Sequence, residues 1–311
     1  MKRAGWLLLL LSGMVWTACS SDDDELVENN NDRKLRQLTI AEVPVTNDTP
    51  TSKRVQLTDN SSSLDALWTK EDRATYFNVS SFSSVTVDYG KLTAASSTAT
   101  SMFQGAVNCI TGDKVALLYP AKDPVLSGPD RGKFNISLNG QKGTLEDIAD
   151  NFHYVYGVAE VTSVTEQTAT ATIDNMQSLL AVSKFSFTDG SELIPVKTLT
   201  INFYDKDFAS LMGYTLTAML TPKAYVSSLA LEYPGQDTWE KTGLSVNLDK
   251  ETSDGVYVAL CPYSPTGYMH FTVTDSLGTT YTGMAKASLK AGRYYPASLK
   301  LTKQQQKTET I

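Results

Sequence analysis

The sequence has too few cysteines and histidines for most sites that depend on them. Its 311 residues include three cysteines and two histidines. Cys19 lies in the leader region, which leaves Cys109 and Cys261, too few for a disulfide framework. Each of the two lies in an apolar run, so we expect buried strand thiols rather than a Cys109–Cys261 disulfide. His153 and His270 have no cysteine or second histidine nearby, so the spacing of zinc ligands is absent.

Motifs of catalysis are missing as well. No Gly-x-Ser-x-Gly elbow and no glycine-rich phosphate loop occurs, and the acidic pair Asp205 and Asp207 lacks the glycine and glutamate of an EF-hand. Carboxylates such as Glu71 and Asp72 fall in turns, where a solvated surface position is the usual outcome, whereas a glycosidase needs two carboxylates facing one cleft. The sequence therefore predicts no enzyme, no metal and no cofactor.

Basic residues are scarce. Lys and Arg number 27 against 34 Asp and Glu, a net charge of −7, and no basic cluster is present. An acidic chain of this kind argues against nucleic acid or an anionic lipid surface as a partner.

Only one long apolar run is present, from Trp6 to Val15, and it is shorter than the roughly 20 residues of a membrane span. Lys2 and Arg3 precede it and small residues follow it up to Cys19, which is the pattern of a signal peptide over residues 1–18. The cysteine after the cleavage point resembles a bacterial lipobox, so we expect a covalent lipid on Cys19. The acidic segment 19–37 is too polar to fold and predicts a flexible tether.

The rest of the chain predicts strands. Alternating apolar residues mark segments such as 38–45, 134–138 and 158–173, separated by turn residues, and only 144–150 has a short helical pattern with Thr144 as its cap. Asn139-Gly140 predicts a hairpin turn. Many short strands indicate an all-β protein, and their number requires two β-sandwich domains. We place these at 38–174 and 175–303, with a boundary near Asp174 and a polar tail at 304–311.

Several motifs in this order resemble the fimbrillin family of pilin-like surface lipoprotein adhesins from oral and gut anaerobes. They are a lipidated cysteine, an acidic tether, a first β-run, a polar loop with an arginine, Leu67-Trp-Thr-Lys-Glu-Asp, Val115-Ala-Leu-Leu-Tyr-Pro, Leu138-Asn-Gly-Gln-Lys-Gly-Thr and Leu289-Lys-Ala-Gly-Arg-Tyr-Tyr. The resemblance implies two tandem transthyretin-like β-sandwich domains and an outer membrane lipoprotein of the cell surface and fimbrium. It also implies adhesion to host or bacterial surface receptors, partner subunits that assemble by β-strand addition, and no catalysis.

The family also implies maturation by a trypsin-like protease at the arginine that matches Arg54. Cutting there would free the first strand, with Leu38, Ile40, Val43 and Val45 as its apolar residues. Pro44 has no N–H to donate, which suits an edge strand or a strand end, and we expect this strand to fill an edge position of the N-terminal sandwich.

The end of the chain departs from the family. The tail after Thr302 has no alternating apolar face, so a donor strand would have to come from Leu299 and Leu301 or earlier. A stalk role is therefore less well supported than a tip, anchor or accessory role. The alternative function is a surface glycan-binding lipoprotein of a polysaccharide uptake system, because aromatic residues such as Trp68 and Trp239 could stack on sugar rings if they are exposed.

Overall fold

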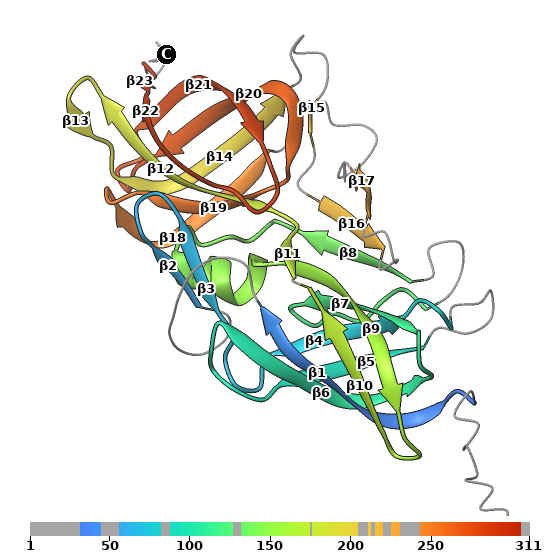
Figure 1. Cartoon of the computed structure of the whole chain (residues 1–311). Helices are drawn as coiled ribbons and strands as arrows, with labels where there is room; N and C mark the ends of the chain where they lie inside the picture. The colour runs from blue at the N-terminus through green and yellow to red at the C-terminus, as the bar shows by residue number, and fades with distance from the viewer. Residues whose placement is uncertain are drawn as a thin grey trace, which may run out of the picture.

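The computed structural model describes residues 32–44, 56–81, 88–126, 132–174, 176–204, 211–212, 215–219, 225–230 and 243–305. These residues form strands almost throughout, with one short helical segment made of α1 (Leu145–Asp147) and the π-helical η1 (Ile148–Phe152) (Figure 1). Thr144 caps this segment, as the sequence predicts, by accepting the amide of Asp147 at 3.1 Å. Within the described ranges no helix has the length and apolar character needed to cross a membrane.

The N-terminal half is a sheet that closes on itself. Neighbouring strands run in the order β1-β6-β5-β4-β7-β9-β10, and β10 pairs back onto β1, so the ladder forms a ring. All contacts in the ring are antiparallel except the parallel pair β1–β10. The strands are β1 (Lys34–Pro44), β4 (Arg73–Asn78), β5 (Tyr89–Ala94), β6 (Thr100–Cys109), β7 (Lys114–Tyr119), β9 (Val155–Val164), β10 (Thr168–Ile173) and the short β11 (Gln177–Ser178), which pairs with β9.

Two expectations about β1 are wrong. The strand is not at an edge, because β6 pairs with it from Lys34 to Pro44 on one side and β10 pairs with residues 37–40 on the other. It also begins at Lys34, inside the segment 19–37 that the sequence analysis assigns to the tether. Pro44 lies at the last position of the strand, where a missing N–H disturbs the ladder least.

The C-terminal half is a sandwich of two sheets. One sheet has the order β22-β12-β19 and the other has β18-β14-β20-β21, with short strands at the margins. The strands are β12 (Ala181–Asp189), β13 (Glu192–Leu193), β14 (Val196–Tyr204), β15 (Leu211–Met212), β18 (Leu244–Thr252), β19 (Val256–Leu260), β20 (Tyr263–Thr274), β21 (Thr280–Leu289), β22 (Tyr294–Lys300) and β23 (Thr302–Lys303).

Both halves repeat one connectivity. In each half the first strand of a series of seven (β1 or β12) pairs in parallel with the last (β10 or β22) and antiparallel with the fourth (β6 or β19). The second strand (β4 or β14) pairs with the third (β5 or β18) and with the fifth (β7 or β20). The equivalent series in chain order are β1, β4, β5, β6, β7, β9, β10 and β12, β14, β18, β19, β20, β21, β22. The all-β class with two tandem sandwiches is therefore confirmed; the exact domain bounds stay a prediction.

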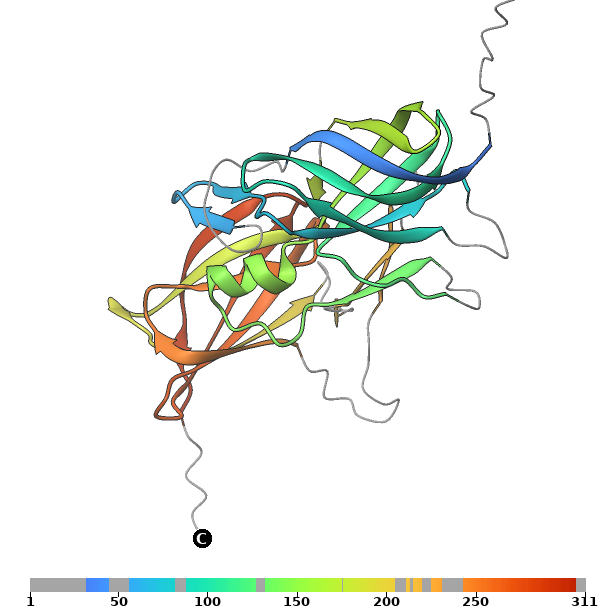
Figure 2. The same cartoon turned by 90° about the horizontal axis from the view of Figure 1, so that it is seen from below.

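A segment of the N-terminal half is inserted into the C-terminal sandwich (Figures 1 and 2). After β8 (Lys133–Ser137), which pairs with β16 (Thr215–Met219), the predicted turn at Asn139-Gly140 is present, but it makes no hairpin with β8. The chain instead runs between β18 and β19: Asn247 donates its amide to the Gln141 carbonyl at 3.0 Å and Tyr257 donates to the Gly143 carbonyl at 2.9 Å.

The side chain of Gln141 completes this insertion. Its amide nitrogen donates to the Ala259 carbonyl at 3.0 Å, and its amide oxygen accepts the Ala259 N–H at 2.7 Å. Gln141 is fully buried. A primary amide thus takes the place of a neighbouring strand at the point where β18 and β19 would otherwise leave backbone groups unpaired.

A second connection comes from the hairpin of β2 (Gln56–Asp59) and β3 (Leu64–Leu67). At the end of β2, Asp59 accepts hydrogen bonds from Tyr257 at 2.6 Å and from Lys184 at 3.0 Å, both in the C-terminal half. Burial alone would raise the pKa of Asp59, but these hydrogen bonds outweigh it and lower the pKa to about 2. Asp59 is therefore ionised at neutral pH and holds β2 onto the C-terminal sandwich.

We predict that Gln141→Leu, which keeps the side-chain volume, lowers the free energy of unfolding by about 2–5 kcal/mol, because it leaves the buried N–H and C=O of Ala259 without partners. Urea unfolding followed by circular dichroism measures this. Gln104→Leu, at an exposed position of β6, is the matched control and should change stability little. Equal stabilities of the two variants would contradict the role given to Gln141.

Candidate functional site: the slot of the first strand

The apolar face of β1 is part of the core. Leu38, Ile40 and Val43 are each fully buried, as their predicted role as strand anchors requires, whereas Val45 lies outside the described residues. Fully burying such a side chain contributes about 1.5–3 kcal/mol, so the three together hold the strand by several kcal/mol. We call the space that β1 fills between β6 and β10 the slot.

The end of β1 contains an irregularity. The register with β6 shifts between Ile40 and Val43, and Glu42 has a φ of 51°, in the left-handed region that residues other than glycine rarely adopt. The extra residue of this bulge returns Val43 to the inner face after Ile40. The strained backbone at Glu42 therefore offsets part of the stabilisation that β1 gains by burial.

Trp68 fixes the C-terminal end of the slot. Its indole N–H donates to the Val43 carbonyl at 2.8 Å, and its ring meets the edges of Phe103 at 4.8 Å and of Tyr119 at 5.2 Å between centroids. Trp68 is 1% exposed. It therefore serves the core and β1, and it offers no face to a sugar ring, which removes one of the aromatic residues behind the glycan-binding alternative.

The N-terminal end of the slot is held by a buried arginine. Arg36 is 1% exposed, and its guanidinium donates to the Thr165 carbonyl at 2.6 Å and to the Cys109 carbonyl at 2.5 Å. These carbonyls lie on the two sides of β1. The sequence analysis placed Arg36 in the tether, although its spacing of two from Leu38 and of four from Ile40 puts it on the same inward face.

A salt bridge lies beside this arginine. Arg33 donates to both oxygens of Asp113, at 2.6 and 3.1 Å, and the carboxylate also accepts from Asn78 at 2.8 Å and from the amide of Ile110 at 3.1 Å. Burial alone would raise the pKa of Asp113, but the hydrogen bonds from Arg33 and Asn78 hold it below its usual value. The slot therefore ends in a fixed negative charge that Arg33, the residue just before β1, neutralises.

The other predicted site residues lie elsewhere. Cys19 and Arg54 are outside the described residues. Leu299 is half-buried in β22, and Leu301 is 1% exposed, with its amide donating to the Thr188 carbonyl at 2.8 Å. Neither leucine lies in a free tail, so the candidate donor strand is an integral part of the C-terminal sandwich.

The two thiols and the histidine His153 are buried. Cys109 and Cys261 are free thiols, as the sequence analysis favours, and burial raises their pKa values to about 11 and about 12. His153 is 3% exposed, neither of its ring nitrogens has a hydrogen-bond partner within the described residues, and burial lowers its pKa to about 4. Among the described residues no group of three or more His, Cys, Asp or Glu side chains could hold a metal ion.

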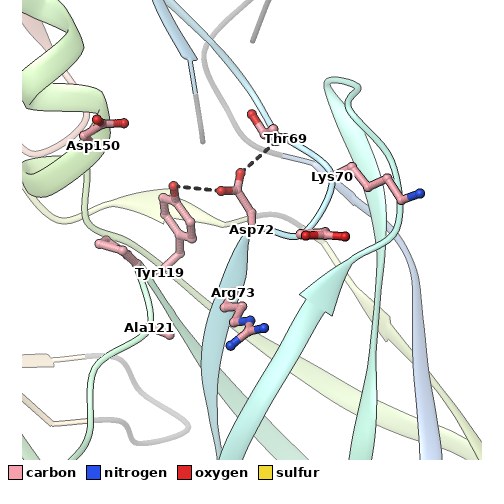
Figure 3. A pocket seen from close by; sticks show the side chains of 9 residues that line it. Thr69, Lys70, Asp72, Arg73, Tyr119, Ala121 and Asp150 are labelled. Atoms are coloured by element: carbon pink, nitrogen blue, oxygen red, sulfur yellow. Dashed lines mark hydrogen bonds between the residues drawn. The ribbon is translucent and has the colours of Figure 1, made fainter. Parts of the chain in front are cut away.

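Figure 3 shows a surface pocket of about 460 Å³ near the turn 69–72. Its Asp72 is already engaged: one oxygen accepts the Tyr119 hydroxyl at 3.2 Å and the other accepts the Thr69 amide at 2.7 Å, which closes the turn. Asp150 faces it from η1, and Tyr119 is 2% exposed. The carboxylate of Asp72 thus has a structural role, and the pocket has no exposed aromatic platform for a sugar.

No protein-family model matches the chain, and no curated protein does. Among solved structures, the chain is similar to a protein from Bacteroides ovatus ATCC 8483 that is provisionally described as a cell adhesion protein (14% identity, TM-score 0.46, 88% of this chain and 97% of that chain). A protein from Bacteroides eggerthii DSM 20697 with the same description has 12% identity and a TM-score of 0.44, with 88% of each chain covered. The tip fimbrial protein Mfa3 from Porphyromonas gingivalis, truncated at its C-terminus, has 12% identity and a TM-score of 0.35, over 80% of this chain and 81% of that one.

We predict that His153 makes stability depend on pH. Its pKa is about 4 in the folded chain and about 6.5 when unfolded, so between these values the unfolded state binds a proton that the folded state does not. The free energy of unfolding should therefore fall as the pH is lowered from 6.5 to 4, by up to about 3 kcal/mol. Urea unfolding at several pH values tests this: His153→Leu should lose that dependence, and the control His270→Gln should retain it. An unchanged dependence in His153→Leu would show that other groups cause it.

Proposed function

We propose that this chain is a pilin-like surface lipoprotein of the fimbrillin type that acts in adhesion and assembles with other subunits by exchange of its first strand. The observation that supports this most directly is the place of β1. It is the first described strand of the chain, it closes the ring of the N-terminal half, and it has a ladder on each side. Removing it would leave one edge of β6 and one edge of β10 without a partner, on either side of an apolar slot.

A single cut would separate β1 from the rest. The strand ends at Pro44 and β2 begins at Gln56, and Arg54 falls in the interval between them. After a cut behind Arg54, β1 would remain only by its non-covalent contacts, because it would no longer profit from the high effective concentration that the peptide linkage provides. A strand from another subunit could then compete for the slot by main-chain pairing with β6 and β10.

The segment after the cut would stay in place. Gln56–Asp59 pairs with β3, and Asp59 is bound to Lys184 and Tyr257 of the C-terminal half. The loss of β1 would therefore not release β2. This arrangement confines the change to the strand that carries the proposed lipid anchor and to the slot that it vacates.

Strand β22, near the C-terminus, and the residue Leu301 after it support a particular place of the chain in a fimbrium. Leu301 is buried and β22 pairs with β12 along residues 294–300, so the C-terminal sandwich would lose its own strand by donating it. We therefore propose a subunit that accepts a strand and does not donate one, which suits a terminal position such as a tip better than a stalk. An anchor subunit would instead stay uncut and keep the strand that carries its lipid.

Brief trypsin treatment of the purified lipid-free protein tests the exchange. We predict cleavage behind Arg54, a new terminus at Val55, and oligomers that appear on gel filtration once the first strand is free. The double variant Lys53→Gln, Arg54→Gln is the control and should stay uncut at this site and monomeric. Resistance of the natural chain to cleavage there would contradict the proposal, as would a cut chain that keeps its first strand and remains monomeric.

The proposed anchor has its own test. In cells supplied with labelled palmitate, the natural protein should take up the label at Cys19 and fractionate with membranes. The Cys19→Ser protein should take up none and keep its leader, because acylation of the thiol precedes cleavage in the lipobox pattern. Normal processing and membrane association of Cys19→Ser would show that the leader acts as an ordinary signal peptide.

A further inference from the structure

The slot selects for charge at one end. Arg36 is buried, and it donates to carbonyls on both sides of the strand, Cys109 of β6 and Thr165 beside the start of β10. Arg33 neutralises Asp113, whose side chain is 3% exposed. If β1 leaves, the carboxylate loses its cation and the two carbonyls lose a donor that the main chain of an incoming strand does not replace.

We infer that the partner of this slot is an extended segment with two basic residues three positions apart, followed by inward-facing apolar residues two and four positions after the second one. This inference rests on the proposed strand exchange. The pattern copies β1 and the residue before it: Arg33, just ahead of the strand, and Arg36 supply the cations, and Leu38 and Ile40 supply the first apolar anchors. An incoming strand without the cations would leave the buried Asp113 carboxylate without a counter-ion and the Cys109 carbonyl without the Arg36 donor, which is more costly than losing exposed ion pairs.

The slot also requires free backbone groups in the middle of the partner strand. Thr39 lies opposite Gln104 of β6 and Thr170 of β10, so this position has a ladder on each side. A proline there would have no N–H to donate on the β10 side, where the amide of Gln37, two residues earlier, donates to the Gln167 carbonyl, and prolines are confined to edge strands and strand ends.

This requirement argues against a second copy of this chain as the partner. Apart from Arg33 and Arg36, the basic spacing recurs in three described places. Lys70 and Arg73 precede the polar Thr75, and Lys300 and Lys303 precede the polar Gln305, so neither pair has an apolar residue two positions on. Lys290 and Arg293 precede Tyr295 and Ala297, at the two positions of the apolar anchors. In this alignment Pro296 falls on the position of Thr39, between the two ladders. A second copy could therefore offer only its own β1, which already fills its own slot. We infer that the partner is a strand of a different subunit with the same charge pattern and no proline at that point.

Competition with synthetic strands tests the inference on the full chain cleaved behind Arg54. The probe is a fluorescent peptide with the sequence of residues 32–44, and its binding is measured by anisotropy. Three variant peptides each lose one positive charge by substitution with norleucine: Arg33→norleucine, Arg36→norleucine and Lys34→norleucine. Lys34 is the matched control, because it pairs with Glu166 at the exposed surface, where 38% and 58% of the two side chains are accessible.

We expect the Arg36 and the Arg33 substitutions each to weaken binding by about tenfold or more, and the Lys34 substitution by no more than about threefold, because exposed ion pairs contribute little. In the Asp113→Asn protein the penalty of the Arg33 substitution should largely disappear while that of Arg36 remains. This coupling is a readout that a general loss of folding would not produce.

The outcomes separate the two proposals. If no peptide binds the cleaved chain, including the unaltered copy of β1, the first strand is not exchangeable and the proposed function fails. If all four peptides bind with similar affinity, strand exchange stands and the inference of a charge-selective slot is overturned. Equal losses for Lys34 and Arg36 would overturn it as well, because they would indicate a non-specific attraction to an acidic protein.

Discussion

The structure depends on the pairing of β1 with two strands at once. A strand at the margin of a sheet leaves one row of N–H and C=O groups in water, which costs little. β1 instead completes a ring: β6 pairs with it from Lys34 to Pro44, β10 pairs with residues 37–40 on the other side, and its inner face is buried. The same position that stabilises the folded chain makes the empty slot unstable, since two rows of backbone groups and an apolar channel would be exposed together. A vacated slot would therefore favour another strand over water.

The polar contacts decide what kind of strand can fill the slot. Apolar anchors such as Leu38 and Ile40 are easily matched by other sequences, because hydrophobic packing tolerates many side chains of similar size. The contacts of Arg36 and Arg33 are less tolerant, since they satisfy the Cys109 carbonyl in a buried contact and the buried Asp113 carboxylate, and these partners lie at fixed positions. Burial thus supplies most of the affinity for the strand, and the two arginines supply most of the selectivity.

Much of the fold could be predicted from local patterns. Period-two alternation marks the inward residues of β1, and Thr144 with Asp147 marks the only described helix, because both signals arise from neighbours in the sequence. The central position of β1 could not be predicted, since an alternating strand looks the same whether it has one partner or two. Arg36 was missed because charged residues suggest a tether, and only its contacts with Cys109 and Thr165 show why the charge is buried. The insertion of Gln141 between β18 and β19 depends on contacts across 118 positions, which no local signal encodes.

The repeated connectivity explains why the proposed exchange would be confined to one half. β12 is the counterpart of β1 and also has a strand on each side, β22 and β19. Its chain continues in both directions into paired strands, so freeing it would need two cuts, whereas one cut suffices for β1, the first described strand. Its inward positions carry Phe185 and Phe187, which pack with Phe271, and its one cation, Lys184, is partly exposed, unlike Arg36. Two sandwiches of the same topology can therefore differ in function because of where their first strands lie in the chain.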